Sequence, residues 1–139
     1  MDRLTPDRRS WNMSRIKGRD TAPEKRVRSL LHRLGFRFSL HKKGLPGRPD
    51  IFLRRFGTAI FVHGCFWHRH ANCKNSVFPK TRPDFWRAKL EGNVERDRRN
   101  QAALKRRGLN TLTVWECEVE DETRLARRLI AELAKARHD

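Results

Sequence analysis

The segment from Gly64 to Arg82 is the feature that most limits how this 139-residue chain can fold. It has neither helical nor strand periodicity, and an aperiodic segment of this length is uncommon in a compact domain unless something organises it. Two of the three cysteines, Cys65 and Cys73, lie in this loop, whereas Cys117 lies far along the chain. An odd number of cysteines argues against a disulfide framework, so a bound metal ion better explains how the loop is ordered.

Zinc is the metal that this set of side chains favours. Three thiolates need one imidazole to complete a tetrahedral site, and His70 lies between the two loop cysteines at a distance from Cys65 that a short chelate loop spans. His68 is an alternative fourth ligand, because spacing alone does not decide between the two. Cys117 would then tie the loop to the sheet. The alternative is three ordinary buried, reduced cysteines.

Apolar periodicity before the loop predicts a helix followed by three strands. The helix spans 21–35: Thr21 and Glu24 fit a capping box, and Gly35 ends the helix. Three short apolar runs follow and predict a meander: residues 36–40, 50–55 and 58–63. Phe36, Phe38 and Leu40 alternate inward in the first run, and the third is typical of a buried central strand.

After the loop, the pattern predicts a helix, a strand and a second helix. A long charged helix runs from Asp84 to just before Gly108, residues 109–117 form a fourth strand, and a terminal helix packs its apolar side chains on the core: Leu125, Leu129, Ile130 and Leu133. The order αβββαβα predicts an α/β fold, a mixed sheet with helices on it. Residues 21–139 form a single domain, and residues 1–20 are an arm that orders on a ligand or is simply disordered.

A strong basic excess indicates a nucleic-acid partner. Lys and Arg number 33 against 16 Asp and Glu, a net charge of +17, and the chain has no apolar run long enough for a membrane span or a signal peptide. We therefore expect a soluble, intracellular protein. Residues 108–139 are slightly acidic and would face away from the phosphates or towards another protein. The alternative for the basic residues is that they lie on solvated helix faces and bind no ligand.

Two aromatic residues, Phe66 and Trp67, follow Cys65 in the loop. A loop tip stapled by a metal is rigid, so it can present rings to a base stack without collapsing. Trp86 is a candidate third ring of this wedge. The alternative is that all three rings belong to the core.

A carboxylate and two histidines indicate hydrolytic chemistry nearby. Asp50 opens the second strand and His63 ends the third, an arrangement in which a carboxylate and a backbone carbonyl hold a hydrated Mg²⁺. His63 and His68 flank the wedge, and a neutral imidazole is a suitable base or acid for phosphodiester hydrolysis.

Five segments of the sequence resemble one known family: NMSRIKGRDTAPEKRVRSLL, LPGRPDI, FVHGCFWHRH, NVERDRRN and TVWEC. They are similar to the very short patch repair endonucleases, bacterial enzymes that nick DNA beside a thymine mispaired with guanine. The resemblance runs from about Ser10 to Cys117. It implies a restriction-endonuclease-like fold, a structural zinc ion and a catalytic Mg²⁺.

The resemblance also implies a role for each matching residue at the catalytic centre. Asp50 would coordinate Mg²⁺ with the backbone carbonyl of Val62, and His68 would act as general base on the attacking water. Three further positions would contribute hydrogen bonds to the hydrated ion or to a catalytic histidine: His63, Asp97 and Glu24. Val62 stands where the family commonly has Thr, so a hydroxyl is absent there but a carbonyl ligand is retained.

The same resemblance assigns the zinc ligands and the wedge. The zinc ligands would be Cys65, His70, Cys73 and Cys117. The rings that intercalate from the major groove would be Phe66, Trp67 and Trp86, and Met13 on the arm would insert from the minor groove.

We therefore expect a monomeric, Mg²⁺-dependent, strand-nicking endonuclease acting on mismatched double-stranded DNA in the bacterial cytoplasm, in the nucleoid. Mismatch-repair proteins are expected partners through the resemblance alone. Two alternatives share the charge and the cysteine cluster. One is a zinc-stabilised, non-catalytic nucleic-acid-binding module, and the other is a nuclease of the same fold that acts on intact or methylated sites.

Overall fold

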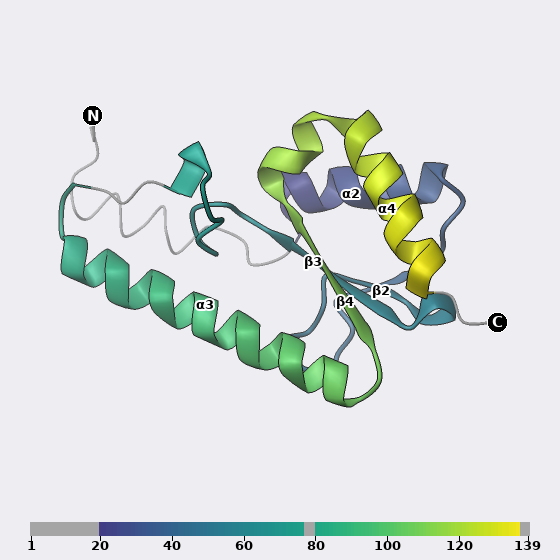
Figure 1. The fold of residues 1–139 in the computed structure, drawn as a ribbon, viewed down its shortest axis with the longest axis horizontal. Coiled ribbons are helices and arrows are strands. Elements are labelled where there is room, and N and C mark those ends of the chain that lie inside the picture. Colours follow the sequence, from purple (N-terminus) through teal and green to yellow (C-terminus); the bar gives the residue numbers. More distant parts are fainter. Residues whose placement is uncertain (1–19, 77–79, 137–139) are drawn as a thin grey trace.

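The computed structural model of the chain describes residues 20–76 and 80–136. Met13 and almost all of the predicted arm therefore lie outside the described residues. The main elements, in chain order, are α2 (Ala22–Arg33), β1 (Ser39–Leu40), β2 (Ile51–Leu53), β3 (Thr58–His63), α3 (Pro83–Arg106), β4 (Asn110–Trp115) and α4 (Glu122–Ala136). This order confirms the αβββαβα pattern (Figure 1). No helix in the described ranges combines the length and apolarity needed to span a membrane.

The four strands form one mixed sheet in the order β1-β2-β3-β4. The pairs β1/β2 and β2/β3 are antiparallel, as the predicted meander requires, and β3/β4 is parallel. A parallel neighbour needs a long crossover, which the loop after β3 and the helix α3 supply. Strand β3 is thus paired on both sides and is the buried central strand that the sequence predicts.

Helices cover the two faces of the sheet unequally. Figure 1 shows α2 and α4 together on one side of the sheet and α3 on the other. The larger core lies under α2 and α4 and includes Val27, Leu31, Ile60, Leu129 and Leu133. The smaller core lies under α3 and is built from Ala59, Phe61 and Leu104.

The start of α2 is fixed by polar contacts that the sequence partly anticipates. The N–H of Glu24 donates to Thr21 Oγ1 at 3.3 Å, which is one half of a capping box. The Glu24 carboxylate accepts instead from the N–H of Asp20, one residue before the helix cap, at 3.2 Å. Gly35 follows the helix with φ of 94°, a conformation that glycine adopts without steric cost.

Two core assignments from the sequence are wrong. Phe36 and Phe38 pack against the core without joining a strand, and Leu40 is 41% exposed because β1 is a two-residue strand at the edge of the sheet. Ile130 is 48% exposed. The buried face of α4 follows a strict four-residue spacing, and Ile130 lies about 100° around the helix from Leu129.

The adjacent pair Leu129 and Ile130 provides a matched test of this core. Leu129 is fully buried, so Leu129→Ala should lower the free energy of unfolding by about 2–5 kcal/mol through lost burial and a cavity. Ile130→Ala should change it by less than about 1 kcal/mol. Urea denaturation of the two variants measures both values, and equal losses would contradict this placement of α4.

Candidate active site

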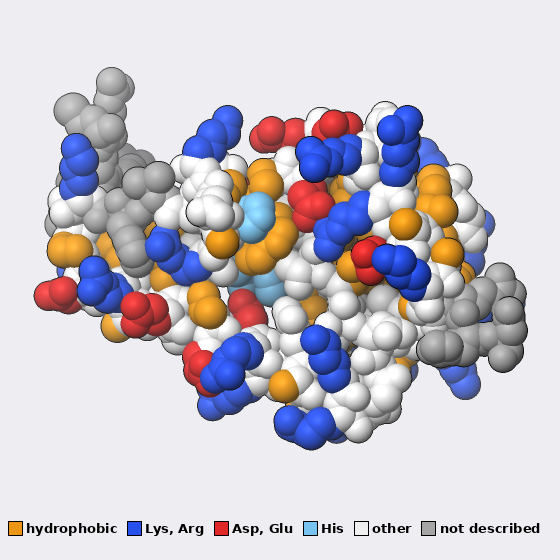
Figure 2. All heavy atoms as spheres, viewed as in Figure 1, with side chains coloured by type: hydrophobic (Ala, Val, Ile, Leu, Met, Phe, Trp, Pro, Cys, Tyr) orange, Lys and Arg blue, Asp and Glu red, His pale blue; other side chains and the backbone are white. Residues whose placement is uncertain are grey.

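An open pocket of about 560 Å³ lies at the end of β3, between the turn before β2 and the middle of α3. Five residues that the sequence analysis singles out line it: Asp50, Val62, His63, His68 and Asp97. They come from three separate stretches of chain that the β2/β3 pairing and the α3 crossover bring together. Figure 2 shows histidine side chains at the surface near the middle of one face, with Lys and Arg spread across the same face.

The carboxylate of Asp50 is fixed against β3. Its Oδ2 accepts a hydrogen bond of 2.7 Å from the N–H of Val62. The N–H and C=O of one residue point to the same side of a strand, so the Val62 carbonyl is also on the Asp50 side. Burial raises the pKa of Asp50, while the Val62 hydrogen bond and the nearby His41, His68 and Arg28 act in the opposite direction. A cation beside Asp50 would stabilise the ionised carboxylate, so the site fits a hard divalent ion.

His68 is held by Asp97. Its Nδ1 lies 2.5 Å from Asp97 Oδ2, and its ring stacks on His63 with centroids 3.8 Å apart. When Nδ1–H donates to the carboxylate, Nε2 carries the lone pair of the neutral ring. Asp97 therefore fixes the tautomer in which His68 can accept a proton at Nε2.

The environment of His63 disfavours its protonated form. Burial and, to a smaller extent, the adjacent His68 lower the pKa of His63 to about 4, against an opposing effect of Asp97. His63 is therefore neutral at neutral pH and has little tendency to take up a proton. Its Nε2 lies 4.0 Å from Asp97 Oδ1, so the same carboxylate faces both rings.

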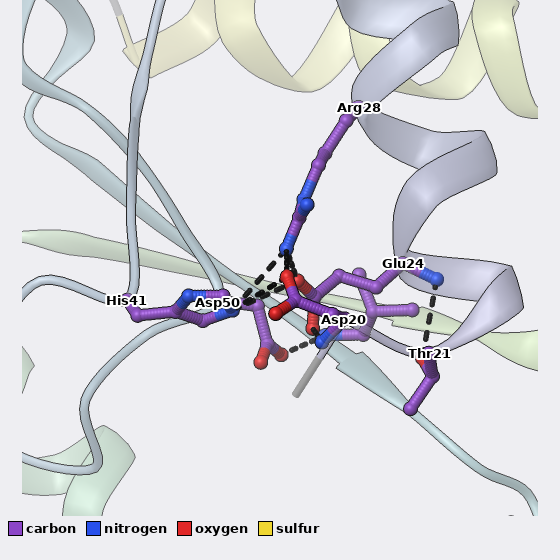
Figure 3. Close-up of polar contacts among 7 residues, drawn as sticks. Asp20, Thr21, Glu24, Arg28, His41 and Asp50 are labelled. Carbon is purple, nitrogen blue, oxygen red and sulfur yellow. Dashed lines mark hydrogen bonds and ion pairs between the residues drawn. The ribbon is translucent and has the colours of Figure 1, made fainter. Parts of the chain in front are cut away.

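Glu24 is placed differently from the other catalytic candidates. It is only 2% exposed. Its carboxylate forms an ion pair with Arg28, accepts a hydrogen bond from the Asp20 N–H and contacts the His41 ring (Figure 3). His41 does line the pocket. Glu24 thus contacts a pocket residue through His41, which sequence reasoning missed together with Arg28. The turn residues HKKG around His41 carry no motif that would have revealed it.

The predicted cysteine cluster is assembled in space. Ligand atoms of four residues lie within 4.8 Å of one another: Cys65, His70, Cys73 and Cys117. His70 Nδ1 is 3.5 Å from Cys117 Sγ, whereas His68 points to Asp97, so the geometry groups His70 with the thiols.

The donor set suits a thiophilic cation. Burial and the neighbouring thiols Cys65 and Cys73 raise the pKa of Cys117 to about 12. Burial also raises the pKa of Cys65, so thiolates at Cys65 and Cys117 need a compensating positive charge, which a metal ion would supply. Three cysteines and one histidine fit a closed, four-coordinate structural metal site.

Hydrogen bonds fold the loop around Cys65. The Cys65 carbonyl accepts from the N–H of His70 at 2.9 Å and from Ser76 Oγ at 2.7 Å. Its N–H donates to Glu116 Oε1 at 3.1 Å, at the end of β4. The aperiodic segment is therefore anchored beside the end of β4 through Glu116, the neighbour of Cys117.

The three aromatic residues of the predicted wedge form one cluster, but they are not equivalent. Phe66 and Trp67 are half-buried and stack at 5.1 Å between centroids. Trp86, from α3, is only 6% exposed and packs edge-on against Phe66 at 5.4 Å. In this structure Trp86 therefore supports the other two rings and does not project with them, which differs from the sequence expectation.

Helix α3 also holds the loop through a residue that was not predicted. Asn93 Nδ2 donates to the backbone oxygen of Trp67 at 3.0 Å. Asn93 and Asp97 are four residues apart and share one face of the helix, so α3 contacts both the wedge and His68. The signal was present in the NVERD segment, where that spacing places both side chains towards the loop.

Comparisons with known proteins identify the family of this chain. The sequence profile of the family described as DNA mismatch endonuclease Vsr matches residues 1–75. Two relatives cover most of the chain. The Type II nicking enzyme V.XorIIP of Xanthomonas oryzae pathovar oryzae is 48% identical over 92% of this chain and 93% of its own length. DNA mismatch endonuclease Vsr of Escherichia coli is 44% identical over 89% of this chain and 79% of its own.

The chain belongs to the Vsr family. It is accordingly a DNA endonuclease related to nicking enzymes, and DNA is its substrate. The Vsr-family chain shares its fold with the catalytic domain of homing endonuclease I-Bth0305I, with a TM-score of 0.60 over 84% of this chain and 98% of that one, at 20% identity. The expected endonuclease-like mixed sheet is thereby confirmed.

The cysteine cluster predicts that this Vsr-family protein retains a metal ion through purification. Cys73→Ser removes one thiolate, so the metal content should fall and the melting temperature should drop, because metal binding at such sites contributes to folding. Elemental analysis and thermal unfolding measure the two effects. Asn75→Ala, an exposed change in the same loop, is the control and should keep its metal. Equal metal content in wild type and Cys73→Ser would contradict this use of the cluster.

Proposed function

We propose that this endonuclease nicks one strand of double-stranded DNA beside the thymine of a T:G mispair, by Mg²⁺-dependent phosphodiester hydrolysis, in very short patch repair. One observation carries the proposal: Asp50 and the His68–Asp97 pair line the same pocket, next to a loop that presents two stacked rings. This geometry unites a site for a divalent ion, a proton acceptor and a wedge.

Charge and ring stacking account for binding. A net charge of +17 attracts the DNA backbone, and Arg48 and Arg96 line the pocket where a phosphate would approach. Phe66 and Trp67, supported by Trp86, would enter the base stack, with Met13 of the arm acting from the minor groove. Unstacking costs least at a mispair, so insertion of rings favours mismatched over paired DNA.

Asp50 and the Val62 carbonyl would hold the catalytic ion. When bound there, Mg²⁺ supplies positive charge that offsets the charge of the phosphate in the transition state and acidifies a coordinated water. The Val62 N–H keeps the Asp50 carboxylate in place through its 2.7 Å hydrogen bond. The aliphatic side chain of Val62 does not interfere, because only its main chain is used.

His68 would take the proton from the attacking water. Asp97 orients the ring and stabilises the imidazolium that forms, while the stacked His63 limits its rotation. The water oxygen bonds to phosphorus as the bond to the 3′ oxygen breaks, which leaves a 5′ phosphate and a 3′ hydroxyl. A single such pocket in a monomer accounts for a nick in one strand.

Zn²⁺ is the ion that we assign to Cys65, His70, Cys73 and Cys117. Soft thiolate donors and one imidazole in a closed set match its tetrahedral preference. Its role is structural, because the same loop carries Phe66, Trp67 and His68. We expect the protein to act on nucleoid DNA in the bacterial cytoplasm and to meet mismatch-repair proteins there.

A second candidate function is nicking at a particular intact or methylated sequence. It is favoured by the names of relatives such as V.XorIIP, a Type II nicking enzyme. It uses the same pocket and differs only in what the wedge and arm recognise.

Cleavage of an end-labelled duplex tests the proposal. A T:G duplex and its T:A control are incubated with Mg²⁺ or with EDTA. Nicking of the T:G duplex alone, and only with Mg²⁺, supports the proposal. Equal nicking of both duplexes favours the second candidate. Binding without cleavage under all conditions would indicate a non-catalytic module and overturn the proposal.

Asp50→Asn tests the metal-binding carboxylate. The amide is a poor ligand for Mg²⁺, so nicking should fall by at least about 100-fold while T:G binding changes little. Gel shift and single-turnover nicking assays give the two values. Glu132→Gln, an exposed change on α4, is the matched control. Full activity of Asp50→Asn would remove this carboxylate from the chemistry.

Trp67→Ala tests the wedge. The half-buried ring should contribute more to mismatched than to matched binding, so the ratio of T:A to T:G dissociation constants should fall by about 10-fold. Fluorescence anisotropy with both duplexes measures this ratio. An unchanged ratio, with both affinities reduced equally, would assign the ring to general support of the loop.

A further inference from the structure

A cluster of charged side chains lies behind the pocket and contacts it at one point. Arg28, from α2, forms ion pairs with the buried Glu24 and with Asp20, the latter at 2.6 Å. The imidazole of His41 approaches from the turn after β1, with Nε2 at 2.9 Å from Glu24 Oε2 and 3.2 Å from Arg28 Nη2. Figure 3 shows these side chains converging on one place, with Asp50 beside His41.

His41 joins this cluster to the main chain of Asp50. Its backbone N–H donates to the Asp50 carbonyl at 3.1 Å, which extends the β1/β2 pairing by one bond. Its φ of 46° lies in the left-handed region, which is uncommon for residues other than glycine and needs support from its surroundings. The contacts of its ring with Glu24 and Arg28 supply that support. One residue therefore has a fixed side chain, a strained backbone and a hydrogen bond to Asp50.

We propose that His41 is a positioning residue for the metal-binding carboxylate of Asp50, anchored at its ring by Glu24 and Arg28 and acting on Asp50 through the backbone. This inference rests on the proposed function, because it takes Asp50 as the ligand of a divalent ion. It also gives Glu24 a role that its burial allows: Glu24 acts through His41, at a distance from the reacting atoms.

The geometry explains why this anchor matters for ion binding. Asp50 is held at two points, its carboxylate by the Val62 N–H and its carbonyl by the His41 N–H. The first contact belongs to the regular strand β3, whereas the second depends on a strained turn. When the ring of His41 is lost, the turn can relax and Asp50 loses the constraint on its backbone, which leaves only the contact of its carboxylate with Val62. Residues that orient a metal ligand in this way typically change metal affinity by about 10–100-fold.

The alanine and glycine variants of His41 separate the side chain from the backbone. His41→Ala removes the anchor and keeps the left-handed strain. His41→Gly removes the anchor and also the strain, because glycine adopts this φ freely, and it retains the N–H that donates to Asp50. If the ring is the anchor, both variants weaken ion binding. If only the backbone conformation matters, the glycine variant behaves like the wild type.

The experiment measures Mn²⁺ binding to the full chain by electron paramagnetic resonance, with Asp50→Asn defining the background. Mn²⁺ prefers oxygen ligands, so it reports on Asp50 and not on the thiol cluster. We expect the Asp50-dependent dissociation constant to rise by about 10-fold in both His41 variants. The Mg²⁺ concentration for half-maximal nicking should rise by a similar factor, while the rate at saturating Mg²⁺ and the affinity for T:G DNA change little. His32→Ala, an exposed histidine on α2, is the matched control and should bind Mn²⁺ like the wild type.

The outcomes distinguish this inference from the proposed function. A wild-type protein that shows no Asp50-dependent Mn²⁺ binding and no Mg²⁺-dependent nicking contradicts the proposed function itself. When the wild type binds and nicks, wild-type Mn²⁺ affinity in His41→Gly overturns the positioning role alone. His41→Gly decides the question even when His41→Ala does not fold, because the glycine variant carries no strain.

Discussion

The pairing of β3 with a neighbour on each side is the constraint from which the rest of the site follows. Antiparallel pairing with β2 brings Asp50 beside Val62, and parallel pairing with β4 requires the chain to cross over through α3. The crossover is what places Asp97 against His68. The C-terminal end of β3 therefore has the carboxylate of Asp50, the proposed metal ligand, on one side and the oriented imidazole of His68 on the other. Neither neighbour alone would assemble this pocket.

The loop after β3 carries residues with three different proposed roles: metal binding, insertion into DNA and proton transfer. Within a few residues it carries Cys65 of the thiol cluster, the rings of Phe66 and Trp67, and the imidazole of His68. It is tied to the end of β4 through Glu116 and to α3 through Asn93. A rigid loop keeps the rings and the imidazole at a constant separation. Under the proposed function, this loop would link recognition of a distorted duplex to delivery of a phosphate to the pocket.

Much of this arrangement could be predicted from the sequence. Glycines and short apolar runs indicated the meander, and the order of elements indicated the mixed sheet. The thiol cluster followed from chemistry, because a bound metal ion accounts both for the odd number of cysteines and for order in an aperiodic loop. The choice between His68 and His70 required coordinates, since both lie at similar spacing from Cys65 and only the fold brings Asp97 to one of them. His41 escaped prediction because its importance comes from an unusual backbone angle and from contacts with a distant helix, and neither leaves a periodic signal. Leu40 and Ile130 were misplaced because apolar character alone does not say whether an edge strand or the side of a helix is covered.

Helix α3 has 24 residues and is roughly 36 Å long. Trp86 lies near its first end, and Asn93 and Asp97 lie on one side of its middle. Arg107 follows its last residue, and the Arg107 side chain donates to the Gly44 carbonyl. A single straight element therefore supports the rings, the imidazole and the turn that precedes Asp50. During evolution, a substitution that shifts this helix to accommodate a new DNA distortion would also displace His68, the proposed proton acceptor. We therefore expect changes in target preference to arise through residues outside α3, or through pairs of substitutions in α3 that keep the helix in place. A shift of the whole helix would lower the rate of cleavage.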